Sequence, residues 1–326
     1  MEVILIFIEK AVGQGIAILY GAMGEILTEK SGNLNLGIPG VMYMGGIAGL
    51  IGAFLYEKNA ASPIPFVGFL IALLCALACG ALGGLIYSFL TITLRVNQNV
   101  TGLALTTFGT GFGNFFGGSL AKLAGGAGQI SVSRTASAFR TGIPGLKNIP
   151  VIGGLLFSYG FLTYFAVVVA IVMGWFLFRT RKGLSLRAVG ENPGTADAAG
   201  IDVTKVKYLA TVIGSAIAGL GGLFFVMEYS GGTWTNNGFG DRGWLAIALV
   251  IFALWKPVNA IWGSIVFGAL YILYLYIPGL TRDAQEIFKM LPYVVTIVVL
   301  VFTSMRKRRE DQPPASLGLP YFREER

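Results

Sequence analysis

The sequence predicts an all-α polytopic membrane protein, a bundle of about nine (roughly eight to ten) transmembrane helices. The chain of 326 residues is 55% hydrophobic and only 12% charged, whereas soluble domains carry about 25% charged residues. Apolar runs near the roughly 20 residues needed to cross a bilayer recur along the whole chain. The runs are continuous and do not alternate with polar residues, which excludes a membrane β-barrel.

Nine apolar segments are expected to form these helices. They lie at residues 11–28, 34–56, 66–92, 98–119, 155–178, 207–229, 243–256, 258–277 and 288–305. The run 243–256 is short for a full crossing, which indicates a tilted or partial helix. Many of the 47 glycines, such as Gly80, Gly83 and Gly84, are spaced for close helix contact in lipid. No segment is large enough to fold separately, so residues 1–326 are expected to form one transmembrane domain.

Lys and Arg predict the orientation, because loops rich in these residues stay in the cytoplasm. The basic tail at 306–326 is therefore expected to be cytoplasmic. With nine crossings, the loop at 179–206 falls on the same side and the N-terminus lies outside. The loop at 120–154 is then external, although it carries four basic residues and no acidic one. Topology, and not nucleic-acid binding, accounts for the net charge of +8.

The polar segment 179–206 lies between two long apolar runs. It is longer than a turn that only leads the chain back into the membrane. Residues 195–199 favour a helix, Pro193 suits a first helical turn, and Gly200 suits a helix end. The pattern predicts a short helix held just outside the bilayer, suited to receiving force from a soluble partner. The alternative is an ordinary cytoplasmic loop.

A second motif, LTEKSGNLNLGIPGVMYMGG at 27–46, places Gly37, Pro39 and Gly40 near the start of an apolar run. Irregular backbone at membrane depth is tolerated where it is buried in protein or lines a cavity, and such breaks often mark a transport path. Asn33 and Asn35 would then offer uncharged hydrogen-bonding groups. The alternative is a plain helix start, capped by Ser31 or Asn33 and kinked at Pro39.

Two further motifs add candidates. The stretch GLALTTFGTGFGNFFGG at 102–118 combines glycines with aromatic rings, which either stack on a flat ligand such as a nucleobase or pack in the core and against lipid. In NNGFGDRGWLAIALVIFALWKP at 236–257, Asp241 and Arg242 stand at the mouth of a helix, as an exposed pair or a docking point for an external partner. The candidates for the substrate path are Asn33, Asn35, Phe108, Asn114, Phe115 and Trp244.

Composition argues against an enzyme. The chain has no histidine, its two cysteines make no metal site, and it lacks the phosphate-binding loop G-x-x-x-x-G-K-[ST]. A transporter of this kind therefore needs an external energy source. A channel or secondary carrier would need coupled-ion groups or an inverted repeat, and Glu25 is the only carboxylate expected deep in the membrane.

Three stretches carry a family resemblance: TEKSGNLNLGIPGVMYMGG, GLSLRAVGENPGTADAAGIDV and GDRGWLAIALVIFALWKPVNA. Together they resemble permease subunits of ABC importers, in the group that handles branched-chain amino acids and simple sugars. The similarity covers roughly residues 20–304 and is greatest to the subgroup that imports nucleosides with basic-membrane-protein-type lipoproteins. Pro39 departs from this pattern, because relatives commonly carry an acidic residue there.

The resemblance implies a type II-importer-like permease in a bacterial-type plasma membrane, surrounded by lipid. Its implied partners are ABC ATPase subunits, a second and non-identical permease subunit, and an external substrate-binding lipoprotein. ATP and Mg would be bound by the ATPases, with no cofactor or metal in this chain. The resemblance assigns ATPase coupling to the RAVGENP region and the residues after it: Arg187, Ala188, Gly190, Glu191, Asn192, Ala196, Ala199 and Gly200.

The implied function is ATP-driven import of nucleosides, with purine nucleosides expected. The scarcity of buried charge agrees with a neutral substrate, because burying an unpaired ion is costly. Import of riboflavin or simple sugars is the alternative within this class. An ATP-independent channel or secondary carrier is the more distant alternative.

Overall fold

The computed structural model describes residues 2–123, 130–142, 157–306 and 311–323, and within these ranges the fold is built from helices. The first half contains α1 (Glu2–Glu29), α2 (Ile38–Asn59), α3 (Pro65–Ser88) with a π-helical turn at Phe89–Thr93, α4 (Gln98–Leu123) and α5 (Ser133–Phe139). The second half contains α7 (Phe161–Arg179), α8 (Arg181–Glu191), α9 (Pro193–Ala198), α10 (Val203–Phe224) with a π-helical turn at Phe225–Tyr229, α11 (Arg242–Phe252), α12 (Pro257–Ile272), α13 (Arg282–Lys289) and α14 (Leu291–Arg306).

Seven helices of the described chain are long and apolar enough to cross a membrane. They are based on α1, α2, α3, α7, α10, α12 and α14. The all-α polytopic fold class is therefore confirmed. The two other predicted segments are also helical: α4 has 26 residues but is rich in Gly, Thr and Asn, and α11 has only 11 residues. The short run at 243–256 is thus a half-length helix, as its length indicated.

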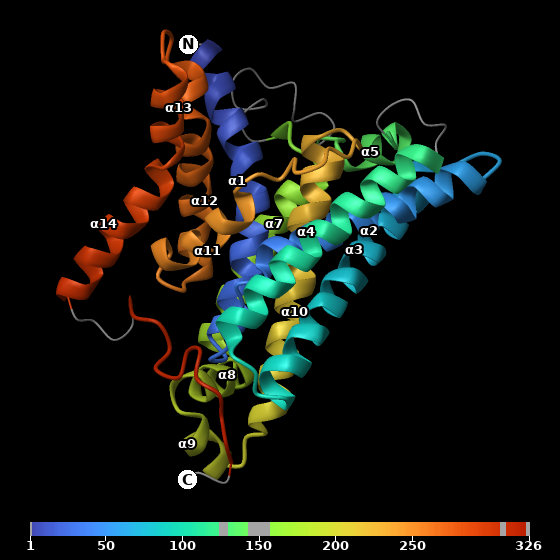
Figure 1. Cartoon of the computed structure of the whole chain (residues 1–326). Helices are drawn as coiled ribbons and strands as arrows, with labels where there is room; N and C mark the ends of the chain where they lie inside the picture. The colour runs from blue at the N-terminus through green and yellow to red at the C-terminus, as the bar shows by residue number, and fades with distance from the viewer. Residues whose placement is uncertain (1, 124–129, 143–156, 307–310, 324–326) are drawn as a thin grey trace.

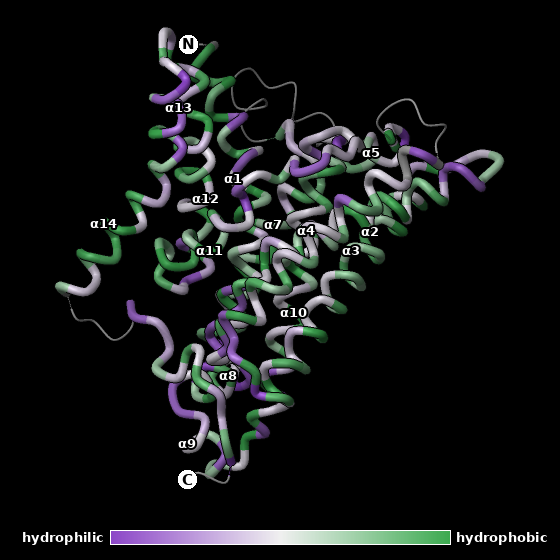
Figure 2. Tube along the Cα trace, in the orientation of Figure 1, coloured by the Kyte–Doolittle hydropathy of each residue, from purple (hydrophilic) through white to green (hydrophobic). Residues whose placement is uncertain are grey.

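The helices place the two groups of connections at opposite ends of the bundle. The N-terminus, α5 and α13 lie at one end, and α8, α9 and the C-terminal tail lie at the other (Figure 1). Hydrophilic residues concentrate at the two ends, around α8, α9 and the tail at one and around α13 at the other, whereas the long helices between them are largely hydrophobic (Figure 2). The segments 179–206 and 311–323 therefore share one end, which is the relation that the predicted topology requires.

Close backbone contacts hold α10 at the centre of the bundle. A Cβ added to Gly24 of α1 would lie 2.3 Å from the carbonyl oxygen of Gly214 in α10. A Cβ on Gly45 of α2 would lie 2.4 Å from the carbonyl oxygen of Gly219. Only glycine fits such contacts, so the predicted use of glycine for helix packing in lipid is confirmed at these positions.

Candidate functional site

The broken-helix motif forms a buried, non-helical segment at residues 30–37, between α1 and α2. Its backbone groups would be costly to leave unpaired inside a membrane protein. Side chains of α1, α3 and α4 form hydrogen bonds with these backbone groups. Two backbone N–H groups donate to side chains: that of Asn35 to Glu25 Oε1 (2.8 Å) and that of Leu34 to Gln98 Oε1 (2.7 Å). Two backbone carbonyls accept from side chains: that of Leu36 from Thr106 (2.7 Å) and that of Leu34 from Tyr87. The segment is therefore irregular backbone buried in protein, as predicted.

The alternative, a plain helix start, is confirmed in that α2 begins here, but its capping by Ser31 or Asn33 is wrong. Helix α2 starts at Ile38 with Gly37 as its N-cap, and Pro39 lies in the first turn, where its missing N–H leaves no bond broken. Ser31 instead donates to the Thr28 carbonyl (2.7 Å), and Asn33 Nδ2 donates to Thr211 Oγ1 (3.1 Å).

Helix α11 starts inside the bundle, after the non-helical stretch 230–241. Its second turn packs on α1, because a Cβ on Gly21 would lie 2.6 Å from Ala246 Cβ. Near its far end, Trp255 donates a hydrogen bond to Glu29. Helix α11 thus covers only the half of the bundle next to α8.

Arg242, at the start of α11, is buried and not part of an exposed pair. Its side chain donates to Gln14 Oε1 (2.6 and 2.9 Å) and to the carbonyls of Phe239 (2.8 Å) and Gly238 (3.2 Å). Its guanidinium also lies over three rings, those of Phe225 (4.8 Å), Tyr271 (5.1 Å) and Tyr229 (5.4 Å). Asp241 is exposed. The predicted exposed pair is therefore corrected: Arg242 points inward because neutral acceptors and aromatic rings stabilise its charge there.

The starts of α11 and α2 meet inside the bundle. A Cβ on Gly243 would lie 2.5 Å from the Cα of Pro39. Pro39 therefore lies against the first turn of α11. This is the position where the permeases that the chain resembles commonly have an acidic residue. Helix N-termini carry partial positive charge, and Arg242 adds a full one. This junction favours neutral or electron-rich groups over cations.

Three of the substrate-path candidates lie on α4. Phe108 and Phe115 are 54% and 66% exposed, and their rings contact Phe112 and Phe116 on the same helix. Asn114 is bonded across to Asn237: its Nδ2 donates to Asn237 Oδ1 (2.8 Å), and its Oδ1 accepts from the Asn237 N–H (3.1 Å). Helix α4 thus fixes the stretch 230–241 and presents aromatic rings outward.

The six candidates do not gather at one place. Asn33 and Asn35 are fully buried in the segment 30–37, Trp244 is half-buried on α11, and the three α4 residues lie elsewhere. Their contact with substrate stays a prediction. Sequence reasoning also missed Glu29, which is 3% exposed, so Glu25 is not the only deeply buried carboxylate.

The segment 179–206 contains two short helices, and residues next to each helix determine where it begins. Thr180 caps α8 by accepting from the Gly183 N–H (3.0 Å), and Asn192 caps α9 by accepting from the Thr195 N–H (3.0 Å). After α9, Gly200 takes the left-handed conformation (φ +83°), and Asp202 then caps α10. The short helix predicted at 195–199 is α9, whereas α8 was not predicted. We call residues 181–200, which contain both helices, the coupling element.

The predicted coupling residues divide between the inside and the surface of this element. Ala196 is 3% exposed and packs with Val189 and Val203 in a small core. Gly190 is buried against the end of α1, where a Cβ would lie 2.3 Å from the Lys30 carbonyl oxygen. Arg187 and Ala188 are half-buried. The exposed members are Glu191, Asn192, Ala199 and Gly200.

Lys30 connects this element to the bundle. It is 8% exposed, and it borders a cavity of about 560 Å³ together with Arg187, Glu191 and Lys256. Burial lowers the pKa of Lys30 to about 8, and the neighbouring Glu191 opposes that shift. The charge of this lysine therefore depends on how α8 sits against the end of α1.

The C-terminal tail, residues 311–323, runs across the coupling element. Ser316 donates from its backbone N–H to the Gly190 carbonyl (3.0 Å), and Gly318 donates to the Gly32 carbonyl (3.1 Å). Further along, Tyr321 and Arg323 both contact the Asp197 carboxylate (2.9 and 3.2 Å). The sequence analysis predicted only a basic tail, yet the run PPASLGLPYF is apolar enough to have indicated a docked segment.

Comparisons with known proteins identify the family of the chain. Residues 7–300 match the family described as branched-chain amino acid transport system / permease component. The chain is 30% identical to the guanosine ABC transporter permease protein NupQ of Bacillus subtilis, over 100% of this chain and 99% of the relative. It is 32% identical to the putative glucose ABC transporter permease protein TsgC13 of Haloferax volcanii, over 89% and 88%. It is 30% identical to the nucleoside ABC transporter permease protein NupC of Lactococcus lactis, over 87% of each. No solved structure matches significantly.

Proposed function

We propose, from the premise that the chain belongs to the family of branched-chain amino acid transport system permease components, that it is the membrane-spanning subunit of an ATP-driven nucleoside importer. In this role the chain binds no ATP itself. It receives movement from partner ATPases, which bind ATP and Mg, and converts it into opening and closing of the substrate path.

The coupling element is the observation that carries this proposal. It is a compact unit with its own small core, and it is attached to α1 through Gly190 and to the C-terminal tail through Ser316. Its exposed residues include Leu184 (60%) on α8 and Ala199 at the end of α9. A partner pressing there would move the ends of α1 and α10 together.

Nucleosides are the substrate class that the observations favour. Two of the three named relatives are permeases of guanosine or nucleoside transporters, which supports a purine nucleoside. The α2–α11 junction combines helix N-termini with a buried arginine and surrounding aromatic rings, which suits a neutral, electron-rich molecule. The glucose transporter relative makes simple sugars the second candidate. Riboflavin stays as a further alternative.

The proposed assembly follows from the two ends of the bundle. The end with the coupling element faces the cytoplasm and the ATPases, so the tail is cytoplasmic and the N-terminus is external. The opposite end, with α5, receives the substrate-binding lipoprotein. A second, non-identical permease packs on the exposed face of α4, where Phe108 and Phe115 would border the path between the two subunits.

A transport assay tests this function. In cells that lack the endogenous nucleoside importer, expression of the complex should restore uptake of radiolabelled guanosine. Unlabelled nucleosides should compete, whereas glucose and riboflavin should not. Competition by glucose but not by nucleosides would contradict the nucleoside assignment.

The coupling role has its own test in a matched pair of exposed alanines. Ala199→Trp, on the coupling element, should abolish uptake and remove the ATPase from the purified complex. Ala61→Trp, in the loop between α2 and α3 at the other end, should leave the ATPase bound to the purified complex. Ala196 is unsuitable for this purpose because it lies in the small core, so its replacement would unfold the element. Normal uptake by Ala199→Trp would refute the assignment.

A further inference from the structure

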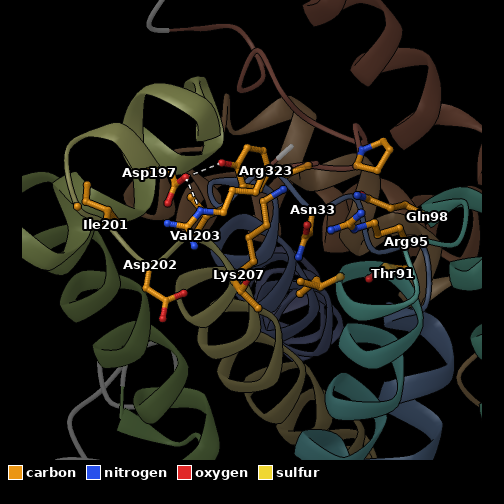
Figure 3. A pocket seen from close by; sticks show the side chains of 15 residues that line it. Asn33, Thr91, Arg95, Gln98, Asp197, Ile201, Asp202, Val203, Lys207 and Arg323 are labelled. Carbon is orange, nitrogen blue, oxygen red and sulfur yellow. Dashed lines mark hydrogen bonds and ion pairs between the residues drawn. The ribbon is translucent and has the colours of Figure 1, made fainter. Parts of the chain in front are cut away.

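A cavity of about 380 Å³ lies beside the coupling element and has no role in the proposed transport cycle. Its walls come from α9, the start of α10, the end of α3, the start of α4 and the C-terminal tail (Figure 3). Two of these walls are the ends of membrane-spanning helices, because one predicted span ends at Thr93 and another starts at Val203. The cavity therefore lies at the depth of lipid headgroups.

Lys207 is the unexplained residue of this cavity. It is 3% exposed, yet within the described part of the chain it has no hydrogen-bond or ion-pair partner. Its ammonium lies by the backbone of Gly32, because a Cβ there would be 3.6 Å from Lys207 Nζ. The ammonium opens onto the cavity and has no anionic partner there, so an anionic ligand in the cavity would stabilise its charge.

A second cation faces the same space. Arg95 follows the π-helical end of α3 in a left-handed conformation (φ +57°), and its guanidinium stacks on Phe322 of the tail (4.5 Å). Arg95, in the loop between α3 and α4, and Lys207, on α10, reach into the cavity with Asn33 between them (Figure 3).

The acidic groups of the cavity are already engaged. Asp197 accepts from Tyr321 (2.9 Å) and pairs with Arg323 (3.2 Å). Asp202 Oδ1 accepts from the Lys205 N–H as the cap of α10 (2.9 Å). With Asp197 paired to Arg323, the cavity keeps Arg95, Lys207 and the Asp202 carboxylate, which leaves a net charge of +1.

The surface next to the cavity is apolar and exposed. It includes Leu94 (54%), Val96 (42%) and Val100 (62%), which flank the cavity residues Arg95 and Gln98 along the chain. Acyl chains cover such surfaces in a membrane, and basic pockets between helix ends bind anionic headgroups. A phosphate in the cavity would thus be continuous with a lipid-facing surface.

We propose that this cavity binds the phosphate headgroup of an anionic phospholipid, held by Lys207 and Arg95 beneath the C-terminal tail. The bound lipid links the end of α10 to the tail that crosses the coupling element. Membrane composition would thereby influence how firmly the coupling element is held.

Native mass spectrometry of the detergent-purified protein tests this. Dioleoylphosphatidylglycerol should bind more tightly than dioleoylphosphatidylcholine, which has the same chains but no net charge. Lys207→Met and Arg95→Gln should each weaken phosphatidylglycerol binding by about five-fold or more, as expected for the loss of one interfacial charge. Lys205→Gln, an exposed lysine on the same helix, should bind as the wild type does.

Folding of the variants is checked separately by thermal unfolding without added lipid. Lys207→Met should be at least as stable as the wild type, because the unpaired charge is gone, but phosphatidylglycerol should no longer stabilise it. Equal phosphatidylglycerol binding by Lys207→Met and the wild type would overturn the proposal. Competition by inorganic phosphate as effective as that by the lipid would assign the cavity to free phosphate instead. Loss of ATPase binding in these variants with lipid binding intact would assign it to the ATPase.

Discussion

The contact between Gly190 and the end of α1 makes the sharpest test of the coupling element. A Cβ at position 190 would lie 2.3 Å from the Lys30 carbonyl oxygen, whereas ordinary contact starts at 3.4 Å. Helix α8 would have to retreat by about 1 Å in Gly190→Ala, and such overpacking costs about 1–3 kcal/mol. The higher helix propensity of alanine returns about 1 kcal/mol. The net expectation is a destabilisation of up to about 2 kcal/mol.

Gly194 supplies the matched control. It lies in α9 of the same element, and a Cβ there would meet Asn192 Oδ1 only at 3.5 Å, an ordinary contact. Gly194→Ala should therefore be neutral, or stabilising by up to about 1 kcal/mol through helix propensity alone.

Two assays read the pair. Apparent unfolding midpoints, measured at one scan rate because membrane proteins often unfold irreversibly, should be a few degrees lower for Gly190→Ala than for Gly194→Ala. Guanosine uptake at equal expression should fall by more than half in Gly190→Ala and stay normal in Gly194→Ala. Equal midpoints and equal uptake for the two variants would refute the view that α8 transmits movement through this contact.

Three further outcomes follow from the described contacts. Arg242→Gln should lower the free energy of unfolding by about 2–4 kcal/mol, because charge-assisted hydrogen bonds and ring contacts are lost. Asp241→Asn should leave it unchanged. Equal unfolding midpoints for the two variants would count against a stabilising role of the buried arginine. Burial lowers the pKa of Lys30 to about 8, against about 10.4 in an unfolded chain. Between these two values Lys30 is protonated only in the unfolded state, so the free energy of unfolding should increase as the pH rises from about 8 to about 10.4. Lys30→Met should flatten this increase, and an unchanged pH dependence in that variant would contradict the effect of burial. In a double-mutant cycle, Asn114→Ala and Asn237→Ala should couple by about 1 kcal/mol in unfolding free energy, and strict additivity would show that their hydrogen bonds do not stabilise the protein.

The helical fold was readable from the sequence because hydrocarbon imposes a simple rule of length and apolarity. That rule located the spans, and it identified 243–256 as too short. It could not show how deep inside the bundle α11 begins, because this depends on the hydrogen bond between Arg242 and Gln14, which are 228 positions apart in the sequence. Sequence proximity instead suggested Asp241 as its partner, which is wrong.

The candidate site shows the same division. Local signals predicted α9: Pro193 lies in its first turn, and Gly200 follows its end in the left-handed conformation. The sequence could not indicate which of its residues face inward, since Gly190 is defined by Lys30 and Ala196 by Val203. The docked tail was missed for the same reason, because its partners Gly32, Gly190 and Asp197 are remote along the chain.

The position of the docked tail bears on how this protein is handled in the laboratory. Arg323 is paired to Asp197, next to the exposed residues of α9. An affinity tag or fluorescent protein fused to that end would lie beside the surface that we propose for the ATPase, where it would compete with assembly of the proposed complex. Purification handles belong at the N-terminus, which lies at the other end of the bundle (Figure 1).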